Sequence, residues 1–242
     1  MSDMRQMEIE WSSWGGPRPG SGRKPSRQGV AHEARDHTTR HVPSMVTLRI
    51  ARGLPSLRQR DVARAVRRAF VAGKERYGMR LCGWSLQDDH IHMIVEADDR
   101  DALTRGLKGL SVRVARALNR YWCRKGRVFG DRFHVLRLGT PTQVRNAWVY
   151  VLQNARKHGR WHRRRFDRFS SGFWFDGWIT GPARRPGGPA PVASPKSWLL
   201  ATGWRRLGPI GMEERPAGER DARLQADRAP RRRTARELAA VG

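Results

Sequence analysis

The sequence predicts an α+β fold, a ferredoxin-like antiparallel sheet with helices on one face, set between basic flexible extensions. Two observations support this prediction. Between residues 45 and 159, stretches that alternate apolar and polar residues interleave with stretches whose apolar residues recur every three to four positions, in the order β-α-β-β-α-β-α. Outside this range the regularity ends. We therefore expect a Gly/Pro-rich basic arm over 1–44, a folded domain over 45–159, and an Arg/Trp-rich extension over 160–242 that is disordered toward its end.

The first half of the domain predicts three strands and a helix. Residues 46–50 alternate apolar and polar side chains, which is typical of a strand. Residues 57–77 place their apolar side chains on one stripe of a helix. Residues 79–86 and 90–97 are two strand-like runs, and the Gln-Asp-Asp between them indicates a hairpin turn.

The second half predicts two more helices and a strand. Residues 101–124 carry leucine and valine on one helical face, and residues 128–138 form a strand candidate that Gly130 interrupts. Thr140 and Pro141 then favour the start of a third helix, because threonine caps helices and proline suits their first turn. This helix is expected to reach about Lys157, with Gly159 as its C-cap.

The charge of the chain constrains its partners. The 242 residues include 49 Lys and Arg against 22 Asp and Glu, a net charge of +27. Such a surface favours a polyanion, above all nucleic acid. The two cysteines exclude a disulfide framework and a cysteine-based zinc site, and the sequence has neither a signal-like start nor an apolar run long enough for a membrane span. We therefore expect a cytoplasmic protein without membrane contact or an organic cofactor.

His90 and His92 lie two positions apart on the third predicted strand. Their side chains leave the sheet on the same face, about 7 Å apart at the Cα atoms, so both rings could converge on one cation. With a third oxygen ligand and open positions, such a pair makes a catalytic metal site. Two polar residues on a solvated face are an equally good interpretation of this short pattern. The opposite face of the strand is fully apolar and should meet the helices: Ile91, Met93, Val95 and Ala97.

One of the three tyrosines differs from the other two. Tyr77 and Tyr121 fall on the apolar stripes of the first and second predicted helices, which indicates core positions. Tyr150 lies about 120° from the apolar stripe of the third helix, and Asn154 follows one turn later on the same side. A phenol beside a metal that polarises a phosphate is a minimal set of groups for attacking a phosphodiester.

These residues carry a family resemblance. Residues 84–95, Trp-Ser-Leu-Gln-Asp-Asp-His-Ile-His-Met-Ile-Val, resemble the HUH motif (His-hydrophobic-His) of single-tyrosine transposases. Residues 149–154, Val-Tyr-Val-Leu-Gln-Asn, resemble their catalytic helix, and residues 126–134 resemble the strand before it. Among IS200-like proteins, the sequence is most similar to the REP-associated tyrosine transposases. In that group an asparagine at the position of Asn154 usually precedes a proline, which Ala155 replaces here. The resemblance covers roughly residues 44–158.

The resemblance implies an HUH transposase fold and a role for each site residue. Tyr150 would attack single-stranded DNA and become linked to its 5′-phosphate. His90 and His92 would hold Mg²⁺ or Mn²⁺, with Asn154 as the third ligand and the neighbouring Gln153 as its competitor. Glu96 shares the histidine face and could act in the second shell, although a solvated strand carboxylate is the simpler interpretation.

The resemblance also implies a partner, a hairpin in single-stranded DNA such as a REP sequence, and a bacterial, nucleoid-associated location. Two other functions stay open: a non-catalytic hairpin-DNA or hairpin-RNA binder or regulator on the same fold, and metal-dependent hydrolysis by an activated water. A monomer is favoured and a dimer remains possible, because no exposed apolar seam stands out.

The extensions offer further DNA contacts. Residues 15–25 form a Gly/Pro/basic segment suited to a narrow minor groove, although a solvated linker explains it about as well. In the C-terminal extension, Trp174, Trp178 and Trp198 are expected to dock onto the domain. The basic residues expected to contact DNA are Arg18, Arg23, Lys24, Arg132, Arg137, Arg163, Arg164 and Arg165.

Overall fold

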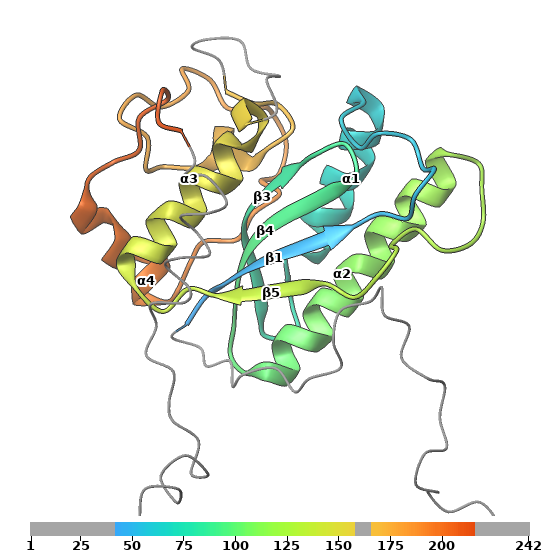
Figure 1. Cartoon of the computed structure of the whole chain (residues 1–242), viewed down its shortest axis with the longest axis horizontal. Coiled ribbons are helices and arrows are strands. Elements are labelled where there is room, and N and C mark those ends of the chain that lie inside the picture. Colours follow the sequence, from blue (N-terminus) through green and yellow to red (C-terminus); the bar gives the residue numbers. More distant parts are fainter. Residues whose placement is uncertain (1–41, 158–165, 216–242) are drawn as a thin grey trace, which may run out of the picture.

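A five-stranded antiparallel sheet forms the centre of the protein (Figure 1). The sequence predicts four of these strands, and the short fifth one, at residues 75–76, lies in a stretch that was predicted as helix. The computed structural model describes residues 42–157 and 166–215. The strand order is β2-β3-β4-β1-β5. The strands are β1 (Ser44–Arg49), β2 (Glu75–Arg76), β3 (Met79–Leu86), β4 (His90–Ala97) and β5 (His134–Arg137). The last strand is shorter than expected, and Phe129 only bridges to Ile50.

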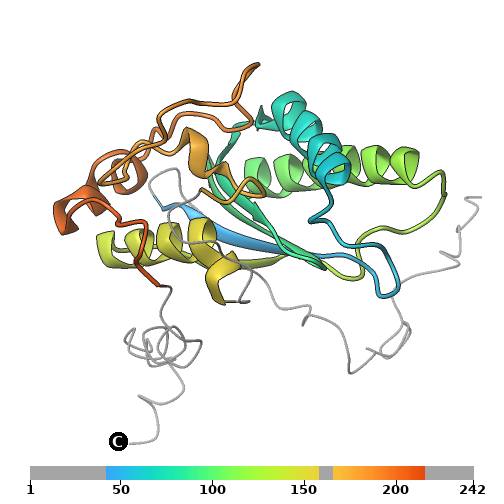
Figure 2. The ribbon, with the colours of Figure 1, turned by 90° about the horizontal axis from the view of Figure 1, so that it is seen from above.

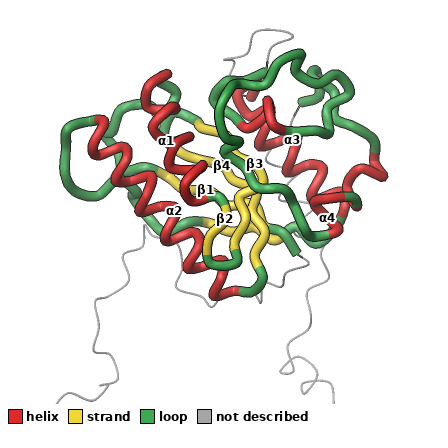
Figure 3. Tube along the Cα trace, turned by 180° about the vertical axis from the view of Figure 1, so that it is seen from behind, coloured by secondary structure: helices red, strands yellow, loops and turns green. Residues whose placement is uncertain are grey.

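Three long helices flank the sheet on both sides. Helices α1 (Arg60–Gly73) and α2 (Arg100–Tyr121) pack on one face, as expected for a ferredoxin-like sheet. Helix α3 (Pro141–Lys157) packs against β3 and β4 on the other face. Figures 2 and 3 show α1 and α2 together on one side of the sheet and α3 on the other. The third helix thus covers the histidine face.

The pleat of β4 explains this division. Its four predicted core residues are fully buried and belong to the cluster shared with α1 and α2. Ile94 points to the other side and joins a second cluster with Trp148 and Val151 of α3. A central strand that is apolar toward two helix layers needs cover on both faces, and α3 provides the second cover.

Gly83 determines how closely α3 approaches the sheet. A Cβ atom at this position of β3 would lie 2.4 Å from Cζ3 of Trp148. Because glycine has no side chain, the indole ring sits directly on the strand backbone. The register of β3 on β4 also shifts between Leu81 and Gly83. Such a bulge re-aims the side chains around it.

Residues 166–215 cover the edge of β3 that the short β2 leaves open. The backbone N–H of Ala193 donates to Leu81 O at 2.7 Å, and Leu86 N–H donates to Phe169 O at 2.7 Å. Covering an exposed edge prevents pairing with other chains. The segment contains three short helical turns, η1 (Ser171–Trp174), α4 (Trp198–Ala201) and η2 (Gly203–Leu207).

The tryptophans of the extension behave unequally. Trp178 packs against the cluster that contains Trp148 and Val151 of α3, so its predicted docking is confirmed. Trp174 is half-buried against the α1–α2 cluster. Trp198 is 48% exposed, contrary to the expectation, because it stacks on Gly203 within the extension itself. The buried anchor is Trp204, which the sequence analysis did not single out.

Two tyrosines lie outside the core, contrary to prediction. Helix α1 ends at Gly73, so Tyr77 falls in the turn between β2 and β3 and is 57% exposed. Tyr121 is the last residue of α2 and is 44% exposed. For Tyr77 the cause is that a helical wheel applies only while the helix continues. No helix in the described part of the chain could span a membrane.

Candidate active site

Three side chains from β4 and α3 converge on the face of the sheet opposite α1 and α2. The Nε2 atoms of His90 and His92 lie 2.9 Å apart, and the Tyr150 hydroxyl lies 3.4 Å from His92 Nε2. The ring centroids of His92 and Tyr150 are 4.9 Å apart at an edge-to-face angle of 73°. The structure therefore brings together the two histidines and the tyrosine that the sequence singled out. Tyr150 is half-buried.

Neighbouring side chains hold both imidazoles by their other nitrogen. His90 Nδ1 lies 2.6 Å from Asp89 Oδ1, and His92 Nδ1 lies 3.0 Å from Thr47 Oγ1. Thr47 stands directly opposite His92 in the β1–β4 ladder. When each Nδ1 carries the proton and donates it to these oxygens, each Nε2 presents a lone pair to the space between the rings. That is the tautomer that a metal-binding histidine needs.

The electrostatics of Asp89 suit this role. Burial raises the pKa of Asp89, but the hydrogen bond and positive charge of His90, together with Arg49, outweigh it and hold the pKa below its usual value. Asp89 is therefore a carboxylate near neutral pH and can accept the Nδ1 proton. On the same sheet, burial and the charge of Glu96 raise the pKa of the Cys82 thiol well above its usual value. Cys82 thus stays protonated and is no rival nucleophile.

Asn154 offers a third donor to a cation. It lies one helical turn beyond Tyr150 and is 1% exposed. Neither Oδ1 nor Nδ2 has a hydrogen-bond partner within residues 42–157 and 166–215. A buried carboxamide without partners is costly, and coordination of its oxygen is one way to satisfy it. The residues therefore fit a divalent cation with mixed nitrogen and oxygen ligands.

The donor set is small. In the described ranges, no group of three or more His, Cys, Asp and Glu side chains could hold a metal ion. A cation at His90 and His92 would therefore take its remaining ligands from an amide, a phenol, water or a substrate phosphate. Imidazole nitrogens suit Mn²⁺ better than Mg²⁺, which prefers a shell of oxygens.

The two other polar residues proposed near the site have different partners. Gln153 is fully buried and donates from Nε2 to Gly211 O at 2.7 Å, so its amide ties α3 to the extension. Glu96 is 1% exposed rather than solvated. Its carboxylate accepts hydrogen bonds from Arg80 Nε and from the backbone N–H groups of Lys196 and Ser197. The structure thus gives Glu96 a role in fixing the extension.

Two of the residues expected to bind DNA, Arg132 and Arg137, lie in the described part of the chain. Arg132 is exposed in the loop before β5. Arg137 pairs with Ser44, which in turn pairs with Val95, so the pleat directs Arg137 to the α1–α2 side of the sheet. The remaining members of the set lie outside the described residues: Arg18, Arg23, Lys24, Arg163, Arg164 and Arg165.

Sequence reasoning missed Thr47 and the role of Asp89. Asp89 precedes His90 directly and was interpreted only as part of a turn. Thr47 lies 45 positions from His92 and becomes its neighbour through strand pairing alone. The available signal was the alternation of the first strand, which places Thr47 on the opposite face from Val46 and Leu48.

The chain is similar to one protein-family model and to several solved structures. Residues 53–154 match the family model for IS200-like transposases. Among solved structures, the chain is similar to a REP-associated tyrosine transposase bound to a REP hairpin, at 16% identity and a TM-score of 0.47, over 58% of this chain and 82% of that chain. It is also similar to a candidate transposase from Deinococcus radiodurans R1, at 13% identity and a TM-score of 0.36, over 49% and 89%. A comparison with curated proteins gives no match. The family-model match includes both histidines, Tyr150 and Asn154, so residues 53–154, which hold the site, match the IS200-like transposases, a family of DNA-processing enzymes.

Proposed function

We propose that the protein cleaves and rejoins single-stranded DNA next to hairpins of the REP type, through a covalent 5′-phosphotyrosine at Tyr150. The observation that carries this proposal is the position of the Tyr150 hydroxyl, 3.4 Å from His92 Nε2 and beside the paired imidazoles of β4. The tyrosine sits on a helix packed on the sheet that bears the histidines. It is thus held by the core and not by a loop.

The reaction is a transesterification. The Tyr150 oxygen loses its proton and forms a bond to the scissile phosphorus, while the bond from phosphorus to the 3′ oxygen breaks. The departing 3′ oxygen takes up a proton and becomes a free hydroxyl. Since one phosphoester replaces another, the same 3′ hydroxyl can later attack the phosphotyrosine and restore the strand.

The chain's own residues orient the reactants. Asp89 and Thr47 fix the two imidazole rings, and the packing of α3 on β3 and β4 fixes the tyrosine. A divalent cation held by His90, His92 and Asn154 would polarise the scissile phosphate and stabilise the charge that develops on it. Phosphate oxygens of the substrate would complete its shell.

We also propose that the protein acts as a monomer on DNA in the bacterial cytoplasm. Helix α3 lies against the sheet on one side and contacts α4 and η2 of the same chain on another. Exchange of this helix between two copies would require the extension to detach as well. The net charge of +27 suits a substrate that is a folded polyanion.

A denaturing gel tests the proposed chemistry. Wild-type protein is incubated with Mn²⁺ and a labelled single-stranded oligonucleotide that carries a REP-like hairpin. We expect a labelled covalent adduct that survives denaturation, is absent in Tyr150→Phe and is absent in EDTA. Tyr121→Phe is the matched control and should form the adduct normally, because Tyr121 ends α2 on the far side of the sheet.

The alternatives give different gels. An adduct that persists in Tyr150→Phe would contradict the tyrosine mechanism. If the DNA is cleaved without an adduct, and this cleavage persists in Tyr150→Phe but is lost in His90→Ala, the reaction is hydrolysis by an activated water. Binding of the hairpin without any cleavage in Mn²⁺ would establish a non-catalytic binder.

A further inference from the structure

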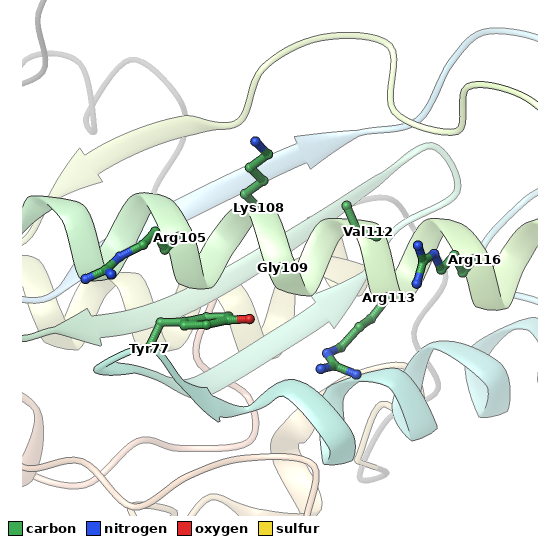
Figure 4. A pocket seen from close by; sticks show the side chains of 7 residues that line it. All are labelled: Tyr77, Arg105, Lys108, Gly109, Val112, Arg113 and Arg116. Atoms are coloured by element: carbon green, nitrogen blue, oxygen red, sulfur yellow. The ribbon is translucent and has the colours of Figure 1, made fainter.

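The side of α2 that faces away from the sheet carries a basic depression of about 460 Å³. Figure 4 shows its lining: the aromatic ring of Tyr77 lies along α2, with Arg105 on one side of it and Arg113 on the other. The depression is on the α1–α2 side of the sheet, whereas His92 and Tyr150 lie on the opposite side. Its lining residues are Tyr77, Arg105, Lys108, Gly109, Val112, Arg113 and Arg116.

Tyr77 occupies a backbone position that normally excludes it. It and Gly78 form the two-residue loop of the β2–β3 hairpin, and their φ angles are +58° and +75°. A hairpin loop with two positive φ values strongly prefers Asn-Gly, because asparagine tolerates the left-handed region and most L-residues do not. A tyrosine here breaks a local rule, and such exceptions concentrate at functional sites.

The helix beneath the ring makes room for it. Gly109 lies in the middle of α2, where glycine is unfavourable. A Cβ atom at this position would lie 3.2 Å from Cε2 of Tyr77, which is tighter than an ordinary contact. Both local departures, the left-handed tyrosine and the helical glycine, have the same result: an aromatic ring rests on α2 while 57% of Tyr77 stays exposed.

The cations around the ring form no ion pair with an acidic side chain of the described residues. Arg105, Lys108, Arg113 and Arg116 form neither an ion pair nor a hydrogen bond with any side chain in the described part of the protein. Spacings of three and four residues place them on one side of α2, across about 16 Å from Arg105 to Arg116. An exposed ring among unpaired cations matches the pattern of single-strand binding, in which bases stack on aromatic rings and cations follow the backbone.

We propose that this depression is a second nucleic-acid site, which takes an unpaired base of single-stranded DNA on Tyr77 and its flanking phosphates on Arg105, Lys108, Arg113 and Arg116. The sheet separates it from Tyr150, so it would hold a part of the substrate other than the scissile phosphate. The choice of DNA as the ligand rests on the proposed function. The geometry of the site is independent of it. A duplex has no unpaired base to offer the ring and would bind only through its phosphates.

Fluorescence anisotropy with a short labelled oligothymidylate in EDTA tests the site apart from any cleavage. Tyr77→Asn introduces the residue that this type of turn prefers, so this variant should fold at least as stably as wild type. We expect it to bind the strand roughly 5- to 100-fold more weakly, as loss of one stacked base requires. Tyr77→Phe should keep the affinity, and Tyr121→Asn, at an exposed tyrosine that ends α2, should bind as wild type does. Arg105→Ala with Arg116→Ala should lower the salt dependence of binding by about 0.7 per lost phosphate contact.

Other results would overturn the proposal. The first is an unchanged affinity of Tyr77→Asn for the oligothymidylate. The second is that Tyr77→Asn loses as much affinity for duplex DNA as for the single strand, and the third is that it loses affinity for oligouridylate but not for oligothymidylate. The fourth is a change of oligomeric state in Tyr77→Asn that accompanies the loss of affinity, which would assign the face to a second copy of the chain. Photocrosslinking of an iodouracil-containing strand gives a direct readout, since the crosslinked peptide should contain Tyr77. The covalent-adduct assay on wild type reports on Tyr150 independently, so either proposal can fail without the other.

Discussion

Asn154 buries its carboxamide without a hydrogen-bond partner among the described residues. Leaving such a group unsatisfied costs about 1–3 kcal/mol. Its neighbour Gln153 is equally buried, and its Oε1 also has no partner among the described residues, but its Nε2 donates to Gly211 O at 2.7 Å. The two adjacent carboxamides therefore differ in how they are held: Gln153 is tied to the extension through its nitrogen, whereas neither polar atom of Asn154 is held by a described residue. This difference favours Asn154 as the third metal ligand.

Replacing each amide by leucine should separate these roles. Without metal, Asn154→Leu should keep or raise the free energy of unfolding, by about 1 kcal/mol, because an apolar side chain removes the unsatisfied amide. It should also abolish the rise in melting temperature that Mn²⁺ gives the wild type. Gln153→Leu should lower the metal-free stability and keep the Mn²⁺ effect. Thermal melts with and without Mn²⁺ measure both, and the reverse pattern would make Gln153 the ligand.

At the scale of elements, the site depends on how closely α3 lies on the sheet. The histidines are fixed to β4 by the pleat, and Tyr150 is fixed to α3 by the helix. The distance between them is therefore set by the contact of Trp148 with Gly83 of β3. Trp148 also packs against Phe175 of the extension, with ring centroids 4.7 Å apart. The indole is thus held between strand and extension.

Gly83→Ala should displace α3 and with it the nucleophile. The added Cβ would lie 2.4 Å from the indole ring, so the helix must shift. We expect a loss of about 1–3 kcal/mol in the free energy of unfolding and a larger fall in adduct formation than in oligonucleotide affinity. Denaturant unfolding and the adduct assay measure these.

Two further variants control this experiment. Gly187→Ala should change nothing, because no heavy atom lies within 4 Å of its Cβ position. Trp148→Phe combined with Gly83→Ala should recover part of the activity, since the smaller ring leaves room for the methyl group. Full adduct formation in Gly83→Ala alone would show that the contact does not position Tyr150.

At the scale of the whole molecule, residues 166–215 bind the two helical layers into one body. Arg58 donates to both carboxylate oxygens of Asp167 at 3.0 Å, on the α1 side of the sheet. On the other side, Arg145 of α3 pairs with Glu214. Between them, the Glu96 carboxylate accepts hydrogen bonds from Arg80 Nε and from the backbone N–H groups of residues 196 and 197. Burial lowers the pKa of Arg80, but Glu96 and Asp98 raise it by more, so the guanidinium stays charged.

Glu96→Gln should loosen the extension. The neutral amide cannot form an ion pair with Arg80, and it accepts the two backbone N–H groups less strongly than the carboxylate does. Breaking a buried ion pair costs about 3 kcal/mol. We expect lower stability and faster trypsin cleavage after the exposed Arg184, which lies in the extension ahead of the clamped residues 196 and 197. Glu75→Gln is the matched control because Glu75 is exposed on β2. Equal trypsin rates in wild type and Glu96→Gln would contradict the clamp.

The sequence by itself determined most of the elements and singled out the candidate site residues. Alternation along β4 placed His90 and His92 on one face, and the helical wheel of α3 set Tyr150 apart from the core. Both follow from the period of side chains along one continuous element, which is local information. Where the element ended, as for Tyr77 beyond α1, the same method failed.

Only the tertiary structure decided which face α3 covers, and this places Tyr150 on the histidines. It also decided that Thr47 holds His92, that Glu96 clamps the extension, and that Tyr77 rests on Gly109 among cations. Each of these contacts joins residues from different elements. Such contacts depend on strand order, register and the side of the sheet that a connection takes, and no periodicity within a single element records them.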